Sequence, residues 1–386
     1  MKALTSAEMR EVDRLTTERY GIPSLQLMEA AGRHVAETFR EISEVSAKHP
    51  QKICVLCGKG NNGGDGFVAA RHLQAAAAQV TVYLFAKPEE LRGDAATNLH
   101  RWCEMGGQVR SVLDEASWSA AWPEISAADA IIDAIFGTGF RGAVSGVVGK
   151  AVDDLNRHSD NARAARPSLI LAVDTPSGLP SDGQAAEGPV LYAHATVTFT
   201  APKLGQLISR EAPAVGLLKV VEIGSPAALV DEVGRSALRW VEPREFAALP
   251  LVRAVDSHKG LYGHVLVVAG SLGKSGAAVM AGHAALRAGA GLVTVATPDV
   301  VLPVVASAHP EYMTEPLLST ETGSASLKSF AGGSFARIVE GKTMLAMGPG
   351  LGTHTQTQEF IRELVLQTEL PVVLDADGLN AFAGHS

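Results

Sequence analysis

Short apolar runs alternate with longer segments of helical periodicity along the first part of the chain. The runs predict strands over 52–57, 80–85, 130–135, 169–174, 195–200 and 217–223. Helices are predicted over 67–77 and 91–105, between the earlier strands. Because strands that alternate with helices join into parallel sheets through right-handed crossovers, the pattern predicts an α/β fold.

Two helices are predicted before the first strand. Thr5 and Glu8 have the spacing of a capping box, which would open a helix that runs to about Tyr20. Ser24 can cap the second helix. The apolar positions of that helix recur at helical spacing and would form a stripe lying on the sheet: Leu27, Met28, Ala31, Val35 and Phe39.

A second α/β unit follows a stretch without clear periodicity from Ser225 to about Pro250. Its predicted strands cover 264–269, 292–297, 344–347 and 372–375, and its predicted helices cover 276–288 and 356–368. The pattern therefore predicts a first domain at 1–225, a linker at 226–250 and a second domain at 251–386.

Length and composition exclude several classes of protein. The 386 residues are too many for one small binding module. A net charge of −8 without a polybasic run gives no reason to expect nucleic acid as a partner. Charges and prolines interrupt the most apolar stretch, 279–308, so no membrane span is expected. The chain opens without a secretory apolar segment, and its three cysteines fit a reducing compartment, so a cytoplasmic location is expected.

A run of glycine and polar residues, GKGNNGGDG at 58–66, lies between a predicted strand and a predicted helix. Glycines let a backbone approach a ligand closely, and free N–H groups at a helix start favour an anion such as a phosphate. The run is not the dinucleotide fingerprint, because none of its windows has the G-x-G-x-x-G spacing. We interpret it as a binding loop that carries Asn61, Asn62 and Asp65.

Two further loops follow strands of the same unit. Asp133 stands before IFGTGFRGA, and Asp174 stands in VDTPSG. Because the carboxyl ends of parallel strands meet at one sheet edge, these loops are expected to converge. Asn62, Asp133 and Ser177 offer hard oxygen ligands without Cys or His, which suits an alkali or alkaline-earth cation rather than zinc.

The second unit also carries small-residue loops. AGSLGKSG at 269–276 is not a Walker A motif, because Val268 stands where that motif needs its first glycine. This segment, GPGLG at 348–352 and the acidic pair Asp375 and Asp377 could line a nucleotide cleft. Close packing of a helix rich in alanine and glycine explains part of the pattern equally well.

With these motifs assembled, the chain resembles the fused NAD(P)H-hydrate repair enzymes, in which an epimerase domain precedes an ADP- or ATP-dependent dehydratase of the ribokinase-like superfamily. The resemblance rests on GNNGGDG, DAIFGTGF and DTPSG in the first unit, and on HKGLYGHVLVVAGS, SGAAVMA, GPGLG and LDADGLN in the second. It implies a Rossmann-like three-layer epimerase domain followed by a partial ribokinase-like α/β domain.

The resemblance also implies an activity. The substrate would be NADHX or NADPHX, which are NADH and NADPH hydrated on the nicotinamide ring. The first domain would interconvert the R and S hydrates, and the second would dehydrate the S hydrate with ADP and magnesium. By the same resemblance Asp174 would bind the hydrate and act as an acid or base.

Further site residues follow from the same resemblance. Substrate contacts would come from Asn61, Asn62, Gly63, Gly64, Asp65, Gly137, Thr138, Gly139, Phe140, Arg141, Gly142 and Ala143. Asn62, Asp133 and Ser177 would hold a potassium ion. In the second domain, Ala277, Gly350 and Asp377 would lie on the substrate side.

The family continues past the LDAD strand with segments that carry the adenine-nucleotide site and the catalytic Asp, and none follows Asp377 here. The dehydratase half is therefore expected to be incomplete and inactive in these residues. A homo-oligomer is expected. Two other classes are weighed: a ribokinase-like small-molecule kinase would leave GNNGGDG unexplained, and a non-catalytic YjeF-type scaffold is disfavoured by the presence of Asn62 and Asp174.

Overall fold

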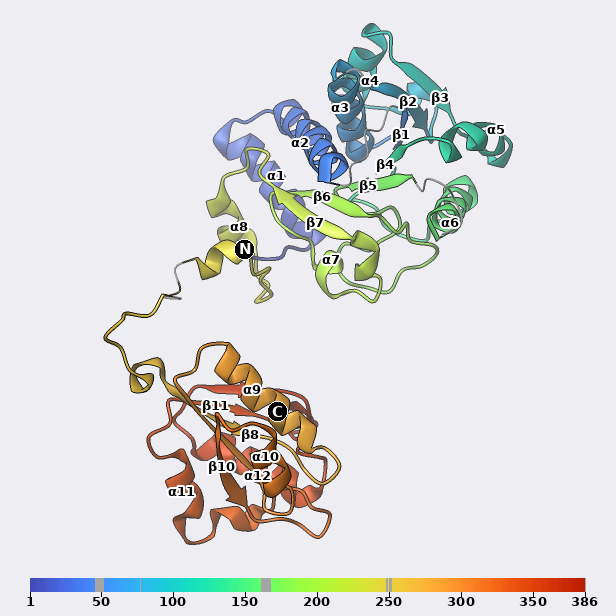
Figure 1. Ribbon diagram of the computed structural model, residues 1–386. Helices are drawn as coiled ribbons and strands as arrows, with labels where there is room; N and C mark the ends of the chain where they lie inside the picture. The colour runs from blue at the N-terminus through green and yellow to red at the C-terminus, as the bar shows by residue number, and fades with distance from the viewer. Residues whose placement is uncertain (46–51, 77, 161–167, 248, 250–251, 386) are drawn as a thin grey trace. The chain divides into compact units, whose positions relative to one another are not determined.

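The computed structural model describes the chain except for residues 46–51, 77, 161–167, 248, 250–251 and 386. The chain divides into two units, Met1–Ala248 and Leu249–Ser386, each built on its own sheet (Figure 1). Every strand pair in both sheets is parallel. The predicted α/β class is confirmed.

The first unit contains a seven-stranded sheet in the order β3-β2-β1-β4-β5-β6-β7. Its strands are β1 (Lys52–Cys57), β2 (Gln79–Leu84), β3 (Gln108–Ser111), β4 (Ala130–Ala134), β5 (Leu169–Val173), β6 (Ala195–Phe199) and β7 (Leu217–Val221). Its α-helices are α1 (Ser6–Tyr20), α2 (Ser24–Val45), α3 (Asn61–Ala75), α4 (Gly93–Glu104), α5 (Glu115–Ser126), α6 (Gly146–Asp160), α7 (Leu204–Ile208) and α8 (Ala227–Val233). Because all seven strands run the same way, their carboxyl ends lie at one edge.

Helices cover both faces of this sheet. On one face α2, α3 and α4 bury an apolar cluster that contains Val55 of β1, and on the other α5 and α6 bury a cluster that contains Leu56. Neighbouring residues enter different clusters because successive side chains of a strand point to opposite faces. The predicted three-layer arrangement is confirmed (Figure 1).

The structure differs from the predicted linker at 226–250. Within this range, Leu229 and Val230 of α8 are buried against α1 residues. Farther along, the backbone N–H of Ala3 donates to the carbonyl of Leu238 over 3.0 Å. The first unit therefore extends past residue 225. Local periodicity could not show this, because the partners lie more than two hundred residues away at the amino terminus.

The second unit contains a five-stranded sheet in the order β10-β9-β8-β11-β12. Its strands are β8 (His264–Val268), β9 (Leu292–Pro298), β10 (Met313–Leu317), β11 (Met344–Met347) and β12 (Val372–Leu374). Its α-helices are α9 (Ser275–Arg287), α10 (Leu302–Ala308), α11 (Ser334–Val339), α12 (Thr355–Gln367) and α13 (Asp377–Asn380). β10 was not predicted, because Pro316 lies within it. Within a strand, proline is found mainly where the strand forms an edge, as β10 does.

The GKGNNGGDG run differs from its interpretation as a loop, because α3 begins at Asn61 rather than near residue 67. A Cβ on Gly63 would lie 1.9 Å from the carbonyl oxygen of Gly58, and one on Gly64 would lie 2.6 Å from Sδ of Met28. A Cβ on Gly66 would lie 2.6 Å from Cβ of Ala134. These glycines therefore let α3 approach the sheet and α2 closely, which is a packing requirement.

We expect Gly63→Ala to lower the free energy of unfolding by about 2 kcal/mol or more, because the added methyl group collides with backbone that cannot rotate away. Gly60→Ala is the matched control from the same run, since a Cβ there has nothing within 4 Å. Its effect should stay within about 0.5 kcal/mol. Denaturant unfolding of both variants measures the difference, and equal losses would contradict the close-packing explanation.

Candidate active site

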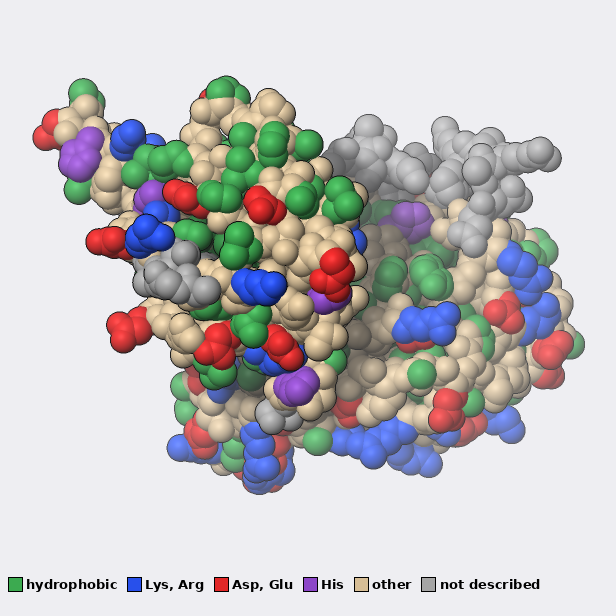
Figure 2. All heavy atoms as spheres, turned by 90° about the horizontal axis from the view of Figure 1, so that it is seen from below, with side chains coloured by type: hydrophobic (Ala, Val, Ile, Leu, Met, Phe, Trp, Pro, Cys, Tyr) green, Lys and Arg blue, Asp and Glu red, His purple; other side chains and the backbone are tan. Residues whose placement is uncertain are grey.

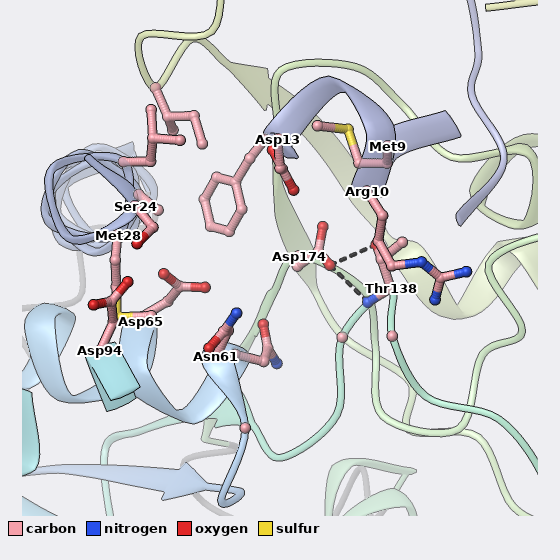
Figure 3. A pocket seen from close by; sticks show the side chains of 18 of the residues that line it. Met9, Arg10, Asp13, Ser24, Met28, Asn61, Asp65, Asp94, Thr138 and Asp174 are labelled. Carbon is pink, nitrogen blue, oxygen red and sulfur yellow. Dashed lines mark hydrogen bonds between the residues drawn. The ribbon is translucent and has the colours of Figure 1, made fainter. Parts of the chain in front are cut away.

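A cavity of about 530 Å³ lies at the carboxyl edge of the first sheet. The loops after β1 and β4 and the ends of β5 and β6 line it from the sheet side. Residues of α1 and α2 close it from the other side, as Figure 3 shows. The edge where strand ends meet thus holds the cavity, as expected for an open parallel sheet.

Asp174 stands at the centre of the hydrogen-bonding in this cavity. It follows β5 directly and has a φ of +62°, a left-handed conformation that is uncommon for a non-glycine residue. Its Oδ2 accepts hydrogen bonds from the backbone N–H of Thr138 over 2.7 Å and from the hydroxyl of Thr138 over 2.6 Å. Strained backbone held by specific contacts is typical of functional sites.

The other oxygen of Asp174 forms a buried ion pair. Oδ1 lies 2.8 Å from Nζ of Lys203, whose side chain is only 1% exposed. Nζ also donates to the hydroxyl of Thr198 over 2.7 Å. Burial raises the pKa of Asp174, but the charge of Lys203 and the hydrogen bonds from Lys203 and Thr138 outweigh it, so the pKa lies below its ordinary value. Asp174 is therefore ionised, and both its oxygens are engaged.

Three other aspartates line the same cavity, Asp13, Asp65 and Asp94, and the pKa values of the first two are raised. Burial raises the pKa of Asp13 to about 6, and nearby Asp174 adds to the effect while Lys203 opposes it. Burial, followed by the charges of Asp174 and Asp13, raises the pKa of Asp65 well above its ordinary value. The side chains of Asp13, Asp65 and Asp174 come from α1, α3 and the end of β5 and point into one space (Figure 3). A fixed carboxylate beside protonatable carboxyl groups suits proton transfer.

Asn62 contributes a polar group without a partner among the described residues. Its Oδ1 and Nδ2 are shielded from solvent and accept or donate no hydrogen bond within the described part of the chain. A Cβ on Gly137 would lie 2.9 Å both from Oδ1 of Asn62 and from Oδ2 of Asp174. Glycine at 137 therefore lets the two functional side chains come together. Buried amide atoms without a protein partner are free to bind a water, an ion or a ligand.

Asp133 and Ser177 lie beneath the cavity and are fully buried. Oδ2 of Asp133 accepts from the backbone N–H of Ser177 over 2.7 Å, and Oδ1 accepts from its hydroxyl over 2.6 Å. Burial raises the pKa of Asp133 to about 6, against the hydrogen bonds from Ser177. The Ser177 hydroxyl also accepts from the N–H of Phe136 over 3.0 Å, which ties this pair to the cavity wall.

The structure places some of the predicted substrate-contact residues in the cavity and others outside it. Asn61, Asn62, Asp65, Asp174 and the loop 137–140 line the cavity. Gly63 and Gly64 instead serve helix packing. The remaining three, 141–143, are exposed and do not line it.

Sequence reasoning missed Lys203 and Asp13. Lys203 had a signal, because it follows the buried strand β6 in TFTAPK, at the same sheet edge as Asp174. Asp13 had none, because it is one of four acidic residues on α1 and looks like a solvated position. Only the packing of α1 over the sheet edge brings Asp13 to the cavity.

The three residues predicted in the second unit lie close together. A Cβ on Gly350 would lie 2.8 Å from Cβ of Ala277. Oδ2 of Asp377 accepts from the N–H of Gly352 over 2.8 Å and lies 3.4 Å from Nζ of Lys274. Burial raises the pKa of Asp377, but these contacts lower it overall. The three predicted positions thus converge on the loops after β8, β11 and β12.

Two further features of the described residues are the distribution of possible metal ligands and the length of the apolar helices. Outside the undescribed gaps, no three His, Cys, Asp or Glu side chains cluster as metal ligands. None of the described helices is long and apolar enough to cross a membrane. On the face in Figure 2, basic and acidic side chains are interspersed with apolar ones.

Comparisons with known proteins agree on both units. A family described as YjeF-related protein N-terminus matches residues 24–205, and one described as NAD(P)H-hydrate dehydratase matches 265–386. Proteins named bifunctional NAD(P)H-hydrate repair enzyme are 42% identical in Moorella thermoacetica and 37% identical in Thermofilum pendens. The alignments cover 99% of this chain and 70% and 69% of those proteins. A solved yeast protein, 24% identical, is similar in fold with a TM-score of 0.50, over 63% of this chain and 98% of that one.

We expect Asp13→Asn to stabilise the chain at pH 7 by about 3 kcal/mol. Because burial raises the pKa of Asp13 to about 6 in the folded state, the folded chain binds this proton more tightly than the unfolded chain does. The stability linked to that proton is present below about pH 4 and is lost as the pH rises through about 6. Denaturant unfolding at pH 4 and pH 7 measures this, with exposed Glu18→Gln on the same helix as control. An equal effect at both pH values would contradict it.

Proposed function

This chain belongs to the family of bifunctional NAD(P)H-hydrate repair enzymes, and we propose that its first unit interconverts the R and S hydrates of NADH and NADPH. The ionised Asp174, paired with Lys203 and flanked by Asp13 and Asp65, is the observation that carries this proposal. A cavity of about 530 Å³ has room for a hydrated nicotinamide nucleotide. It lies where a parallel sheet presents its functional groups.

Inversion at the carbon that bears the added hydroxyl requires that a bond there breaks and re-forms on the opposite face. If the hydroxyl leaves as water, it takes one proton, and the neighbouring ring nitrogen becomes positively charged. Water that returns on the other face gives that proton back. Asp13, with its pKa near 6, is suited to lend and recover the proton, and the fixed charge of Asp174 stabilises the positive ring.

We expect Asp174→Asn to slow epimerisation by about 100-fold or more, because the substitution removes the negative charge aimed at the reacting ring. Asp231→Asn, exposed on α8, is the matched control and should keep the wild-type rate. Chiral separation of the R and S hydrates over time measures the rate, and circular dichroism checks the fold. A folded Asp174→Asn protein with wild-type kinetics would contradict the assignment.

Potassium is proposed to bind Asn62 of the cavity lining together with Asp133 and Ser177. The unpartnered Oδ1 of Asn62, the carboxylate of Asp133 and the hydroxyl of Ser177 are oxygen donors with one formal charge, which suits a monovalent ion. A bound potassium ion would supply positive charge close to the substrate. Asn62 would then have a partner for its buried oxygen, and the start of α3 would be held in place.

We expect potassium to raise the melting temperature and the epimerase rate of the wild-type protein relative to a tetramethylammonium buffer, because the ion binds only the folded chain. Ser177→Ala should lose most of both responses. Ser119→Ala, an exposed serine of α5, is the control and should respond as the wild type does. Equal melting temperatures in both buffers for the wild type would show that Asp133 and Ser177 serve only to hold their loops.

The second unit is proposed to take part in ADP-dependent dehydration of the S hydrate, with magnesium. Support comes from the family match over 265–386 and from the convergence of Ala277, Gly350 and Asp377. The expected loss of dehydratase turnover in these 386 residues stays a prediction. A homo-oligomer and a cytoplasmic location also stay predictions, and the free thiols of Cys54, Cys57 and Cys103 fit the latter.

A further inference from the structure

The first unit has a second cavity, of about 340 Å³, that the chemistry above does not use. Lys59, Ile135 and Phe136 line both cavities, so one thin wall separates the two. Phe136 stacks on Phe140 of the first cavity with ring centroids 4.1 Å apart. The second cavity is therefore a neighbour of the reaction site along the same sheet edge.

The second cavity lies beyond the carboxyl ends of three adjacent strands. Gly58 follows β1, Phe85 follows β2 and Ile135 follows β4, and all three line it. After β1 the chain adds β2 and β3 on one side of β1, and then adds β4 on the other side. The boundary between β1 and β4 is therefore the point where the strand order reverses. Open α/β sheets bind nucleotides at such a reversal point. The second cavity reaches the end of β2, and the first reaches Asp174 at the end of β5. Because neighbouring strands lie about 4.8 Å apart, these two strand ends are separated by about 14 Å across the sheet.

The lining of the two cavities differs in charge. The first carries four Asp residues against Arg10, Lys59 and Lys203. The second has apolar walls, which include Phe85 and Leu113, with Lys59, Lys87 and Glu90 as its charged groups. A planar base fits the apolar walls, and phosphates are favoured by the lysines rather than by the acidic first cavity.

Lys59 is placed to serve both halves of a long ligand. Its Nζ lies 3.2 Å from Glu90, but the side chains are 64% and 44% exposed. An exposed ion pair of this kind contributes at most about 1 kcal/mol to stability. A diphosphate can therefore replace Glu90 as the partner of Lys59 with little loss of stability. The shared wall is also where the diphosphate that joins the two nucleotides must pass.

We propose that the second cavity binds the adenylate half of the hydrated dinucleotide, with Lys59 at the diphosphate and Lys87 at the 2′-phosphate that distinguishes NADPH from NADH. Lys87 is suited to this task because the residues after the second strand of a dinucleotide-binding sheet read the ribose 2′ position. The inference rests on the proposed epimerase function, since it assigns the remote half of that substrate.

The test compares the full chain with two variants on three substrates: the hydrates of NADH, NADPH and reduced nicotinamide mononucleotide. Leu113→Trp fills the second cavity from a side chain that is 47% exposed, so the fold should tolerate it. We expect kcat/KM for both dinucleotide hydrates to fall about tenfold and that for the mononucleotide hydrate to stay unchanged. Lys87→Glu should lower kcat/KM for the NADPH hydrate about tenfold relative to the NADH hydrate.

Lys52→Glu provides the matched control, because Lys52 is an exposed lysine at the opposite end of β1. It should leave all three substrates unaffected. An equal loss on the mononucleotide and dinucleotide hydrates in the Leu113→Trp protein, or no loss on any, would overturn the assignment of the second cavity. A wild-type chain that turns over none of the three hydrates would instead overturn the proposed epimerase function, and the cavity assignment with it.

Discussion

The buried ion pair between Lys203 and Asp174 constrains the sheet edge on which the site depends. An unpaired charge at either position would be costly away from water, so the end of β5 and the segment after β6 must stay in register. Gln206 reinforces this arrangement, because its side-chain amide donates to the carbonyl oxygen of Asp174 over 2.6 Å. The same contacts hold Asp174 in its left-handed conformation.

Other features of the cavity follow from this pair. Because Asp174 is ionised and cannot move, its charge makes ionisation of Asp13 and Asp65 harder. The Thr138 loop is held by two hydrogen bonds to Asp174, and Gly137 leaves room for Asn62 beside the same oxygen. Burial raises the pKa of both neighbours most, and the single fixed carboxylate of Asp174 adds to that effect while it also holds the position of a loop.

The sequence predicted features that depend on local patterns. The buried strands β1, β4 and β5 were predicted because continuous apolar runs between helices are typical of parallel sheets. Short or interrupted elements such as β3 and β10 were not. Asp174 and Asn62 were predicted because they stand at strand ends in unusual motifs. Asp13 depends on contacts between distant segments, and local spacing carries no record of those. Lys203 had a local signal, its place after β6, that was not used.

The glycine run shows a different limit. Its glycines indicated correctly that another group approaches the backbone closely. The composition could not show whether that group was a ligand or another part of the protein. The structure places backbone and side chains of the protein within reach of Gly63, Gly64 and Gly66. The polar residues between and before them, which α3 presents from its first turns, line the cavity.

The contacts between the amino terminus and residues 226–240 determine where the two halves of such a fused enzyme can be separated. Leu229 and Val230 cover the helix that carries Asp13, and the strand-like pairing of Lys2 with Arg239 fixes where that helix starts. A gene cut at the apparent boundary near 225 would preserve every strand of the sheet yet uncover this helix. The connector between the two catalytic halves is thus also part of the first one, and an autonomous epimerase has to be excised together with it.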